Sequence, residues 1–189
     1  MRITQFPIAS IFTERWSPRA MSGESITQEE LMALFEAARW APSSNNNQPW
    51  RFYYAQRESH YWNRFFALLM TGNQIWCSQA AALIVLVSKG TFDHNGMPAR
   101  THGLDAGAAW CQLALQGSIS GLVVHCMQGF DYDQAAVVLG LPEDYYVECI
   151  IAIGKPGVKE SLPDNLQARE FPNDRRPLSE IVFEGEFVK

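Results

Sequence analysis

Two guanidinium groups and a hydroxyl lie within five residues near the N-terminus. Arg15, Ser17 and Arg19 alternate there with Trp16 and Pro18. The planar fork of arginine offers paired donors to a phosphate, and a nearby hydroxyl can add another. The spacing favours an anion-binding turn, although a solvated, charged turn has the same composition.

A second pair of cationic residues, Arg175 and Arg176, precedes Pro177 in the last part of the chain. These side chains also suit a phosphate, and a surface patch is the alternative explanation. The surrounding tail lacks the periodic pattern of a helix or a strand, so an ordered structure there needs another source of stabilisation. A bound ligand could supply it.

A third segment that could bind a ligand lies between Pro42 and Pro49. Its residues are small or amide-bearing, polar and uncharged: Ser43, Ser44, Asn45, Asn46, Asn47 and Gln48. Such a segment has many donors and acceptors, and suits a planar, polar, mostly neutral ligand such as a flavin ring. An ordinary loop between a helix and a strand has a similar composition and remains the alternative.

Several common catalytic motifs are missing from the sequence. It contains no G-x-G-x-x-G, no P-loop and no G-x-S-x-G, and the spacing of its four histidines does not suggest metal ligation. We expect His125 to be a hydrogen-bonded core residue and Asp105 to belong to a structural ion pair, but a chemical role for either, or for Cys126, stays open. The sequence therefore predicts no catalytic side chain and no metal site, and it assigns any chemistry to a bound cofactor.

The elements that must position these residues follow from periodicity and caps. Thr27 and Glu30 have the spacing of a capping box, so a helix begins there and should stop before Ala41 because Pro42 follows. The run 82–87 is continuously apolar, as in a strand buried on both faces. The other patterns predict strands over 50–55, 121–127 and 147–153, and helices over 58–71, 101–118 and from Asp131 to the cap Gly140.

Two features point to contacts beyond a simple core. The predicted helix 101–118 is dense in small residues, and Gly107 costs about 1 kcal/mol relative to alanine unless another backbone approaches closely. We therefore place this helix at the centre of the fold or at a subunit contact. The end of the tail, 181–187, is apolar and extended enough to need a partner surface.

Length and composition limit the class of protein. With 189 residues, 47% of them hydrophobic, the chain predicts one domain over 1–189 whose tail, 155–189, is irregular. A net charge of −5 argues against nucleic acid as the main partner. The four cysteines form no C-x-x-C pair, and no apolar run is long enough for a secretory signal or a membrane span. We expect a soluble cytoplasmic protein.

Segments spread from about residue 11 to residue 182 resemble, in the same order, motifs of the nitroreductase family of FMN enzymes. The opening 15–19 resembles R-x-S-x-[RK], and the loop 42–50 is similar to P-S-S-x-N-x-Q-P-W. Further similarities lie at 72–76 (GNQIW), 121–131 (GLVVHCMQGFD), 152–156 (AIGKP) and 175–178 (RRPL). The resemblance implies an α+β fold with a mostly antiparallel sheet flanked by helices. It also implies an intertwined homodimer, in which each C-terminal segment joins the partner's sheet and two FMN molecules lie at the interface.

The resemblance also assigns residues to the FMN phosphate and ribityl chain. It implies that Arg15 and Ser17 hold these groups, that Arg19 lies near the pyrimidine edge of the ring, and that Arg175 completes the phosphate clamp together with Arg176. Trp16 lies within this cofactor-binding motif, at a position where the family often has a basic residue or histidine.

The remaining implied contacts are with the flavin ring. The loop would reach the ring from the second subunit through Pro42, Ser43, Ser44 and Asn46, with Gln48 bracing it. The Asn73 side chain would contact the ring, and one ring face would be lined by the backbone of Met127, Gln128 and Gly129.

The implied activity is a ping-pong reaction in which NADH or NADPH passes a hydride to flavin N5. A small electron-poor acceptor, such as a nitroaromatic, a quinone or a flavin, would then be reduced. Two alternatives remain open: an FMN-binding carrier or redox-sensing protein without turnover, and a family member with other chemistry, such as dehalogenation, flavin fragmentation or ring oxidation.

Overall fold

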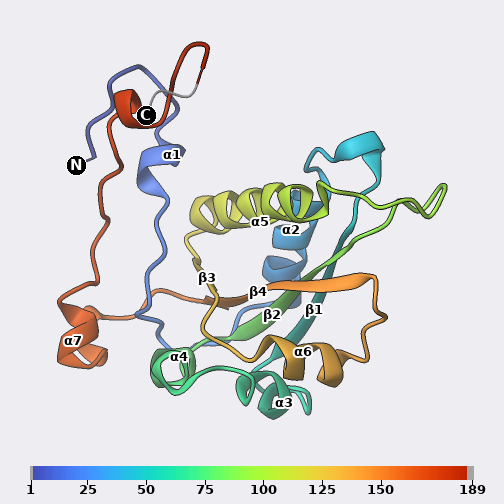
Figure 1. Cartoon of the computed structure of the whole chain (residues 1–189). Helices are drawn as coiled ribbons and strands as arrows, with labels where there is room; N and C mark the ends of the chain where they lie inside the picture. The colour runs from blue at the N-terminus through green and yellow to red at the C-terminus, as the bar shows by residue number, and fades with distance from the viewer. Residues whose placement is uncertain (1, 187–189) are drawn as a thin grey trace.

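The computed structural model describes residues 2–186 and is built around one four-stranded antiparallel sheet (Figure 1). The strand order is β1-β2-β4-β3, with β1 at Trp50–Gln56, β2 at Ala82–Lys89, β3 at Val123–Met127 and β4 at Tyr145–Gly154. The first seven residues of β2 are buried, as the continuous apolar run predicted. The predicted α+β class, with a mostly antiparallel sheet flanked by helices, is confirmed.

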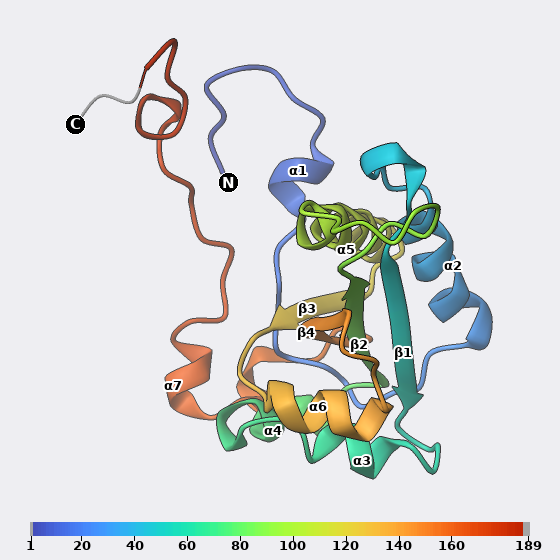
Figure 2. The same cartoon turned by 45° about the vertical axis from the view of Figure 1, so that its right-hand side comes forward.

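Helices cover both faces of the sheet and create two hydrophobic cores (Figures 1 and 2). On one face, Ile84 and Leu86 pack with α2 (Gln28–Arg39) and α5 (His102–Ile119). On the other face, Leu83 and Val85 pack with α3 (Trp62–Phe66), α4 (Thr71–Cys77) and α6 (Tyr132–Leu139). Alternate β2 side chains therefore enter opposite cores, as the period of a strand requires.

The predicted helix ends are confirmed at three positions. In the capping box of α2, the Glu30 backbone N–H donates to Thr27 Oγ1 at 3.1 Å, and the Thr27 N–H donates to Glu30 Oε2 at 2.7 Å. The Asp131 carboxylate caps α6 by accepting the Gln134 N–H at 2.8 Å. Gly140 ends α6 in the left-handed region, with φ 63°.

The single helix predicted over 58–71 is wrong. The chain forms the short α3 and then α4, which contains the whole segment 72–76. Between these helices, Leu69 forms an isolated bridge with Phe130, and the Met70 N–H donates to the Gly129 carbonyl at 3.0 Å. Pairing with a distant segment replaces the local helical hydrogen bonds, so tertiary contacts override the helical pattern.

A close approach on α5 occurs at a different glycine from the one singled out in the sequence. Gly107 is exposed, and a Cβ there would meet nothing within 4 Å in this chain. Gly117 is buried against β3, and a Cβ there would overlap the Cγ2 methyl of Val124. Gly117 therefore lets α5 lie directly on the sheet, while Gly107 remains on an open surface.

The two ends of the chain lie beside each other, away from the sheet (Figures 1 and 2). The N-terminal arm contains α1 (Ile11–Glu14), and the tail contains η2 (Lys159–Ser161), α7 (Asp164–Gln167) and η3 (Leu178–Glu180). The Leu178 N–H donates to Gln5 Oε1 at 3.1 Å, which joins the two ends directly. Ile181, Val182 and Phe183 follow η3 and are more than half exposed, whereas Phe187 of the predicted extended end lies outside the described residues.

None of the helices over residues 2–186 combines the length and the apolarity that crossing a bilayer requires.

We predict that Gly117→Ala destabilises the protein by about 1–3 kcal/mol, because the added methyl overpacks the contact with Val124. Urea unfolding followed by circular dichroism measures the change. Gly72→Ala is the matched control, because a Cβ at Gly72 in α4 has open space around it. A Gly117→Ala variant as stable as Gly72→Ala would contradict the close approach of α5 to β3.

Candidate functional site

Arginine side chains from distant parts of the chain meet at one cavity of about 400 Å³. The segment after α1, the strand β3 and the tail after α7 all contribute to it. The predicted motif 15–19 and Arg175 therefore come together, but Arg176 does not reach the lining. The lining contains Arg2, Arg15, Trp16, Ser17, Arg19, His125, Arg169, Phe171, Asn173 and Arg175.

The electrostatics of this arginine cavity are those of an anion site. Burial lowers the pKa of Arg15, and the positive charges of Arg175 and Arg2 lower that pKa further. Among the described residues, no carboxylate forms an ion pair with any of these three arginines. Like charges held together without a counter-charge favour the binding of an anion. Arg15 Nη1 also donates to the Ser17 hydroxyl oxygen at 3.4 Å, which places that hydroxyl beside the guanidinium.

Arg2 is a member of this cavity that the sequence analysis missed. Its Nε donates to the Asn173 carbonyl at 2.9 Å, and its Nη1 donates to the carbonyls of Thr13 at 3.0 Å and Arg15 at 2.9 Å. Its Nη2 is buried without a hydrogen-bond partner. Arg2 thus fastens the N-terminal arm to the tail across 171 residues, and no local spacing could have revealed this contact.

Glu170 is the second residue that the sequence did not indicate. Its Oε1 accepts the backbone N–H groups of Arg19 at 2.6 Å and Ala20 at 2.8 Å. Its Oε2 lies 3.8 Å from Nη1 of Arg19, and the carboxylate side chain is only 4% exposed. A buried carboxylate from the tail therefore holds the last arginine of the opening motif.

His125 on β3 lines this cavity and packs against the ring of Trp76. Its Nδ1 lies 2.9 Å from the Pro18 carbonyl, which can only accept, so we assign a proton to Nδ1. Burial lowers the pKa of His125, which favours the neutral ring. The Trp76 ring lies 4.6 Å from the imidazole, centroid to centroid. His125 is hydrogen-bonded as predicted, but the predicted core position is wrong, because the side chain is only partly buried and lines the cavity.

The segment 127–129 is positioned by Asn73. The Asn73 Nδ2 donates to the Gly129 carbonyl at 2.9 Å, and its Oδ1 accepts from Trp76 Nε1 at 3.3 Å. A Cβ at Gly129 would lie 2.5 Å from Asn73 Nδ2, so the absence of a side chain there permits this contact. Met127 is buried in the core and Gln128 is exposed. The contacts of Asn73 and of 127–129 with a flavin remain predictions.

The uncharged polar loop, residues 43–48, has an unusual backbone. It contains η1 (Ser44–Asn46), and Asn45, Asn46 and Gln48 have φ values of 51°, 52° and 49°. Left-handed conformations at non-glycine residues store strain and are common at functional sites. The Gln48 N–H donates to Ser43 Oγ at 3.0 Å, and its Nε2 donates to the Asn46 carbonyl at 3.0 Å. The prediction that Gln48 braces the loop is confirmed.

Asp105 anchors the same loop to the first turn of α5. Its Oδ2 accepts the Ser44 N–H at 3.2 Å and lies 3.4 Å from Thr101 Oγ1. The predicted ion pair is wrong: no cation pairs with Asp105 in residues 2–186. Backbone and hydroxyl donors face this buried carboxylate instead of a lysine or an arginine.

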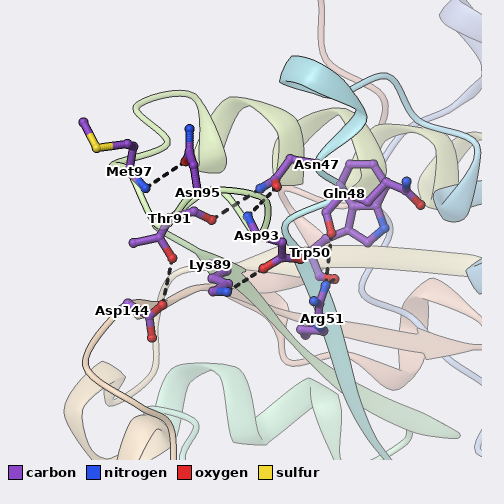
Figure 3. A network of polar contacts seen from close by, with 10 residues as sticks. All are labelled: Asn47, Gln48, Trp50, Arg51, Lys89, Thr91, Asp93, Asn95, Met97 and Asp144. Carbon is purple, nitrogen blue, oxygen red and sulfur yellow. Dashed lines mark hydrogen bonds and ion pairs between the residues drawn. The ribbon is translucent and has the colours of Figure 1, made fainter.

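A second set of contacts fixes the loop to the hairpin at 91–98 (Figure 3). The Asn47 Oδ1 accepts the Asp93 N–H at 3.0 Å, and Thr91 Oγ1 donates to Asp144 at 2.9 Å. Arg51 turns back onto the loop, where its Nη1 donates to the Gln48 carbonyl at 3.0 Å. The hairpin and Arg51 thus both fix the strained backbone of the loop.

The polar loop and the arginine cavity lie at different places in this chain. The loop packs at the N-terminal end of α5, whereas the cavity lies beyond α1 near β3 and the tail (Figure 1). None of Pro42, Ser43, Ser44, Asn46 and Gln48 lines the cavity. Within one chain the predicted site residues therefore form two separate groups.

Cys126 and Cys149 lie on the paired strands β3 and β4 and share one core. The neighbouring Cys126 thiol and burial raise the pKa of Cys149. Both cysteines pack in the hydrophobic core on one face of the sheet, and neither lines the arginine cavity.

Comparison with known proteins agrees with this architecture. The nitroreductase family model matches residues 12–64, which include both the opening motif and the polar loop. A solved structure of an oxidoreductase containing FMN is 43% identical, covers 99% of this chain and 96% of its own, and superposes with a TM-score of 0.95. A nitroreductase family protein from Clostridium difficile 630 has the same fold at 22% identity, covering 96% and 100% of the two chains, with a TM-score of 0.73.

A 15.4 kDa protein from Mycolicibacterium smegmatis is 29% identical over 119 residues, which are 62% of this chain and 78% of that protein. This chain thus shares its α+β fold, over nearly its whole length, with a protein described as an oxidoreductase. The chain belongs to the nitroreductase family.

We predict that Asp105→Ala frees the polar loop, because the Ser44 N–H loses its acceptor at a cost of about 1–3 kcal/mol. Hydrogen exchange at the Ser44 amide measures this change, and we expect exchange about 5- to 150-fold faster. Asp105→Asn is the control, because its amide oxygen can still accept. Equal protection in the alanine variant would show that the loop does not depend on this carboxylate.

Proposed function

We propose that the protein is an FMN-dependent oxidoreductase that passes reducing equivalents from NADH or NADPH to a small electron-poor acceptor. One observation carries the proposal: Arg2, Arg15 and Arg175 meet at a single cavity without a carboxylate partner. A phosphomonoester dianion would supply the missing counter-charge. The 43% identical structure, described as an oxidoreductase containing FMN, supports the choice of FMN.

The residues present fit the phosphate and ribityl chain of FMN. Arg15 and Arg175 would bind phosphate oxygens, Ser17 would donate its hydroxyl, and Arg2 would hold Arg15 and Asn173 in position. The buried, unpartnered Nη2 of Arg2 supports this fit, because an unsatisfied donor is costly in the absence of an acceptor. Arg176 lies outside the lining and is the weakest of the proposed contacts.

The ring would extend from this cavity toward the segment fixed by Asn73. The Met127–Gly129 backbone would line one ring face, and Arg19 would face the pyrimidine edge, where a cation favours the added negative charge. When bound, FMN supplies the two-electron chemistry that links the nicotinamide donor to the acceptor. The protein's part is to bind, orient and tune, and no side chain is assigned as an acid, base or nucleophile.

We propose that a second copy of the chain completes the site with its polar loop, in a homodimer with exchanged C-terminal segments. The loop and the cavity are separate within one chain, yet both carry the family's motifs. Apolar side chains that a partner chain could cover are exposed on α5 and in the tail: Leu104 and Ile119 on α5 are 74% and 67% exposed, and Phe183 in the tail is 63% exposed. An open Gly107 on the same helix permits close approach of another backbone.

The purified protein tests these proposals directly. We expect a yellow preparation that releases FMN on denaturation, oxidises NADH or NADPH rapidly when a quinone or nitroaromatic is added, and has the mass of a dimer by light scattering. Tight FMN binding without turnover would favour the carrier or redox-sensing alternative. A colourless monomer that does not bind added FMN would contradict the proposed function.

We predict that Arg15→Ala weakens FMN binding by about 10- to 150-fold, or about 1.5–3 kcal/mol, because a charge-assisted hydrogen bond is lost. Fluorescence titration of the apoprotein with FMN measures the dissociation constant. Arg39→Ala is the matched control, because Arg39 lies on the surface of α2 in an ion pair with Glu36. Riboflavin, which lacks the phosphate, should show a much smaller difference between wild type and Arg15→Ala. Equal losses for FMN and riboflavin would argue against the phosphate assignment.

A further inference from the structure

Glu170 is the acidic residue that pairs with an arginine of the cavity, although it does not line the cavity itself. Its side chain is almost fully buried and reaches Arg19 from a segment 151 residues away. Burying a carboxylate is costly unless its oxygens are well paired. Oε1 has two strong backbone donors, whereas Oε2 has no hydrogen bond and pairs, among the described residues, with the Arg19 guanidinium. The charge of Glu170 also raises the pKa of the nearby His125, against the larger effect of burial.

The two oxygens act on different parts of the same residue. The bonds from the Arg19 and Ala20 N–H groups to Oε1 fix the backbone at the point where the opening motif turns toward the core. The pairing at Oε2 limits where the guanidinium can lie and partly offsets its charge. Arg2, Arg15 and Arg175 have no such partner, so Arg19 is the arginine whose charge and direction are under separate control.

We propose that Glu170 is the positioning residue for Arg19, and that through Arg19 it sets the reduction potential of the bound flavin. This inference rests on the proposed FMN site. Glu170 would touch neither the flavin nor the substrates. Its effect would run through the guanidinium that faces the ring, because a cation at that edge favours the reduced, more negative flavin.

The charge part of the proposal is tested by Glu170→Gln. Glutamine keeps an oxygen that can accept both backbone N–H groups but removes the negative charge beside Arg19. We expect reduced FMN to bind three- to tenfold more tightly relative to oxidised FMN, a rise in potential of up to about 30 mV for a two-electron couple. Redox titration of the bound FMN against a reference dye measures the shift.

The route through Arg19 is tested by repeating Glu170→Gln in an Arg19→Gln background. If Glu170 acts through Arg19, most of the shift disappears when the guanidinium is absent. An equal shift in both backgrounds would mean that Glu170 acts directly on the flavin and would overturn the proposal. An unchanged potential in both backgrounds would overturn it as well.

The backbone part is tested on the apoprotein, without FMN. Glu170→Ala should increase hydrogen exchange at the Arg19 and Ala20 amides at least tenfold, while Glu170→Gln should largely preserve their protection. The Ser22 amide is the internal control, because it donates to the Lys155 carbonyl at 3.0 Å and not to Glu170. Unchanged exchange at Arg19 and Ala20, or an equal increase at all three amides, would contradict a specific positioning role.

These two readouts separate the inference from the proposed function. If the wild-type protein fails to bind FMN, the function is wrong, but amide exchange still reports whether Glu170 positions Arg19. If FMN binds and the potential does not respond to Glu170→Gln, the function stands and the inference fails.

Discussion

The repulsion among Arg2, Arg15 and Arg175 is the constraint on which the rest of the site depends. Guanidinium groups do not gather in a partly buried place unless the chain holds them there. Burial lowers the pKa of Arg15, and the charges of Arg175 and Arg2 lower that pKa further. Neutral hydrogen-bond acceptors hold at least one of these guanidinium groups in place. Arg2 donates to three backbone carbonyls, which fix the group without neutralising it. The positive charge therefore remains available to a ligand.

The same requirement explains why irregular segments build so much of the site. The arm before α1 and the tail after α7 have little regular structure, yet Arg2 joins both to the backbone of the opening motif. The rigid part lies beside them: β3 carries His125, and Gly117 allows α5 to pack directly on that strand. A packed sheet thus supplies a fixed edge, and two long-range hydrogen-bonded segments bring the charges to it.

Sequence reasoning succeeded where local patterns determine structure. The capping box at Thr27 and the buried strand β2 follow from short-range spacing, whereas the bracing role of Gln48 came from the resemblance to the family's loop. It failed at residues 58–71, because pairing of Leu69 with Phe130 replaced a helix that the local pattern favoured. The mostly antiparallel sheet flanked by helices followed from the resemblance to the family motifs, whereas the strand order β1-β2-β4-β3 was not predicted.

At the candidate site, too, local spacing revealed some residues and long-range contacts concealed others. The motif arginines Arg15 and Arg19 could be selected from spacing alone, since alternating cations beside a hydroxyl form a recognisable anion-binding pattern. Arg2 and Glu170 could not, because each acts across more than 150 residues and neither lies in a motif. The ion pair expected at Asp105 failed for a related reason: a carboxylate in a sequence does not reveal whether its partner is a cation or a backbone amide.

The overall charge of the chain adds a last argument about selectivity. The protein is acidic, with a net charge of −5, yet the cavity lining has five arginines and, among the described residues, no carboxylate. A local cationic cavity in an acidic protein attracts small anions that can enter it, while the surrounding negative field opposes large polyanions such as nucleic acids. Arg2, Arg15 and Arg175 have no carboxylate partner among the described residues, which suits a compact anion. Arg19 differs from them, because Glu170 partly offsets its charge. An anion that carries its charge on one compact group therefore suits this cavity better than a ligand with charge spread along its length.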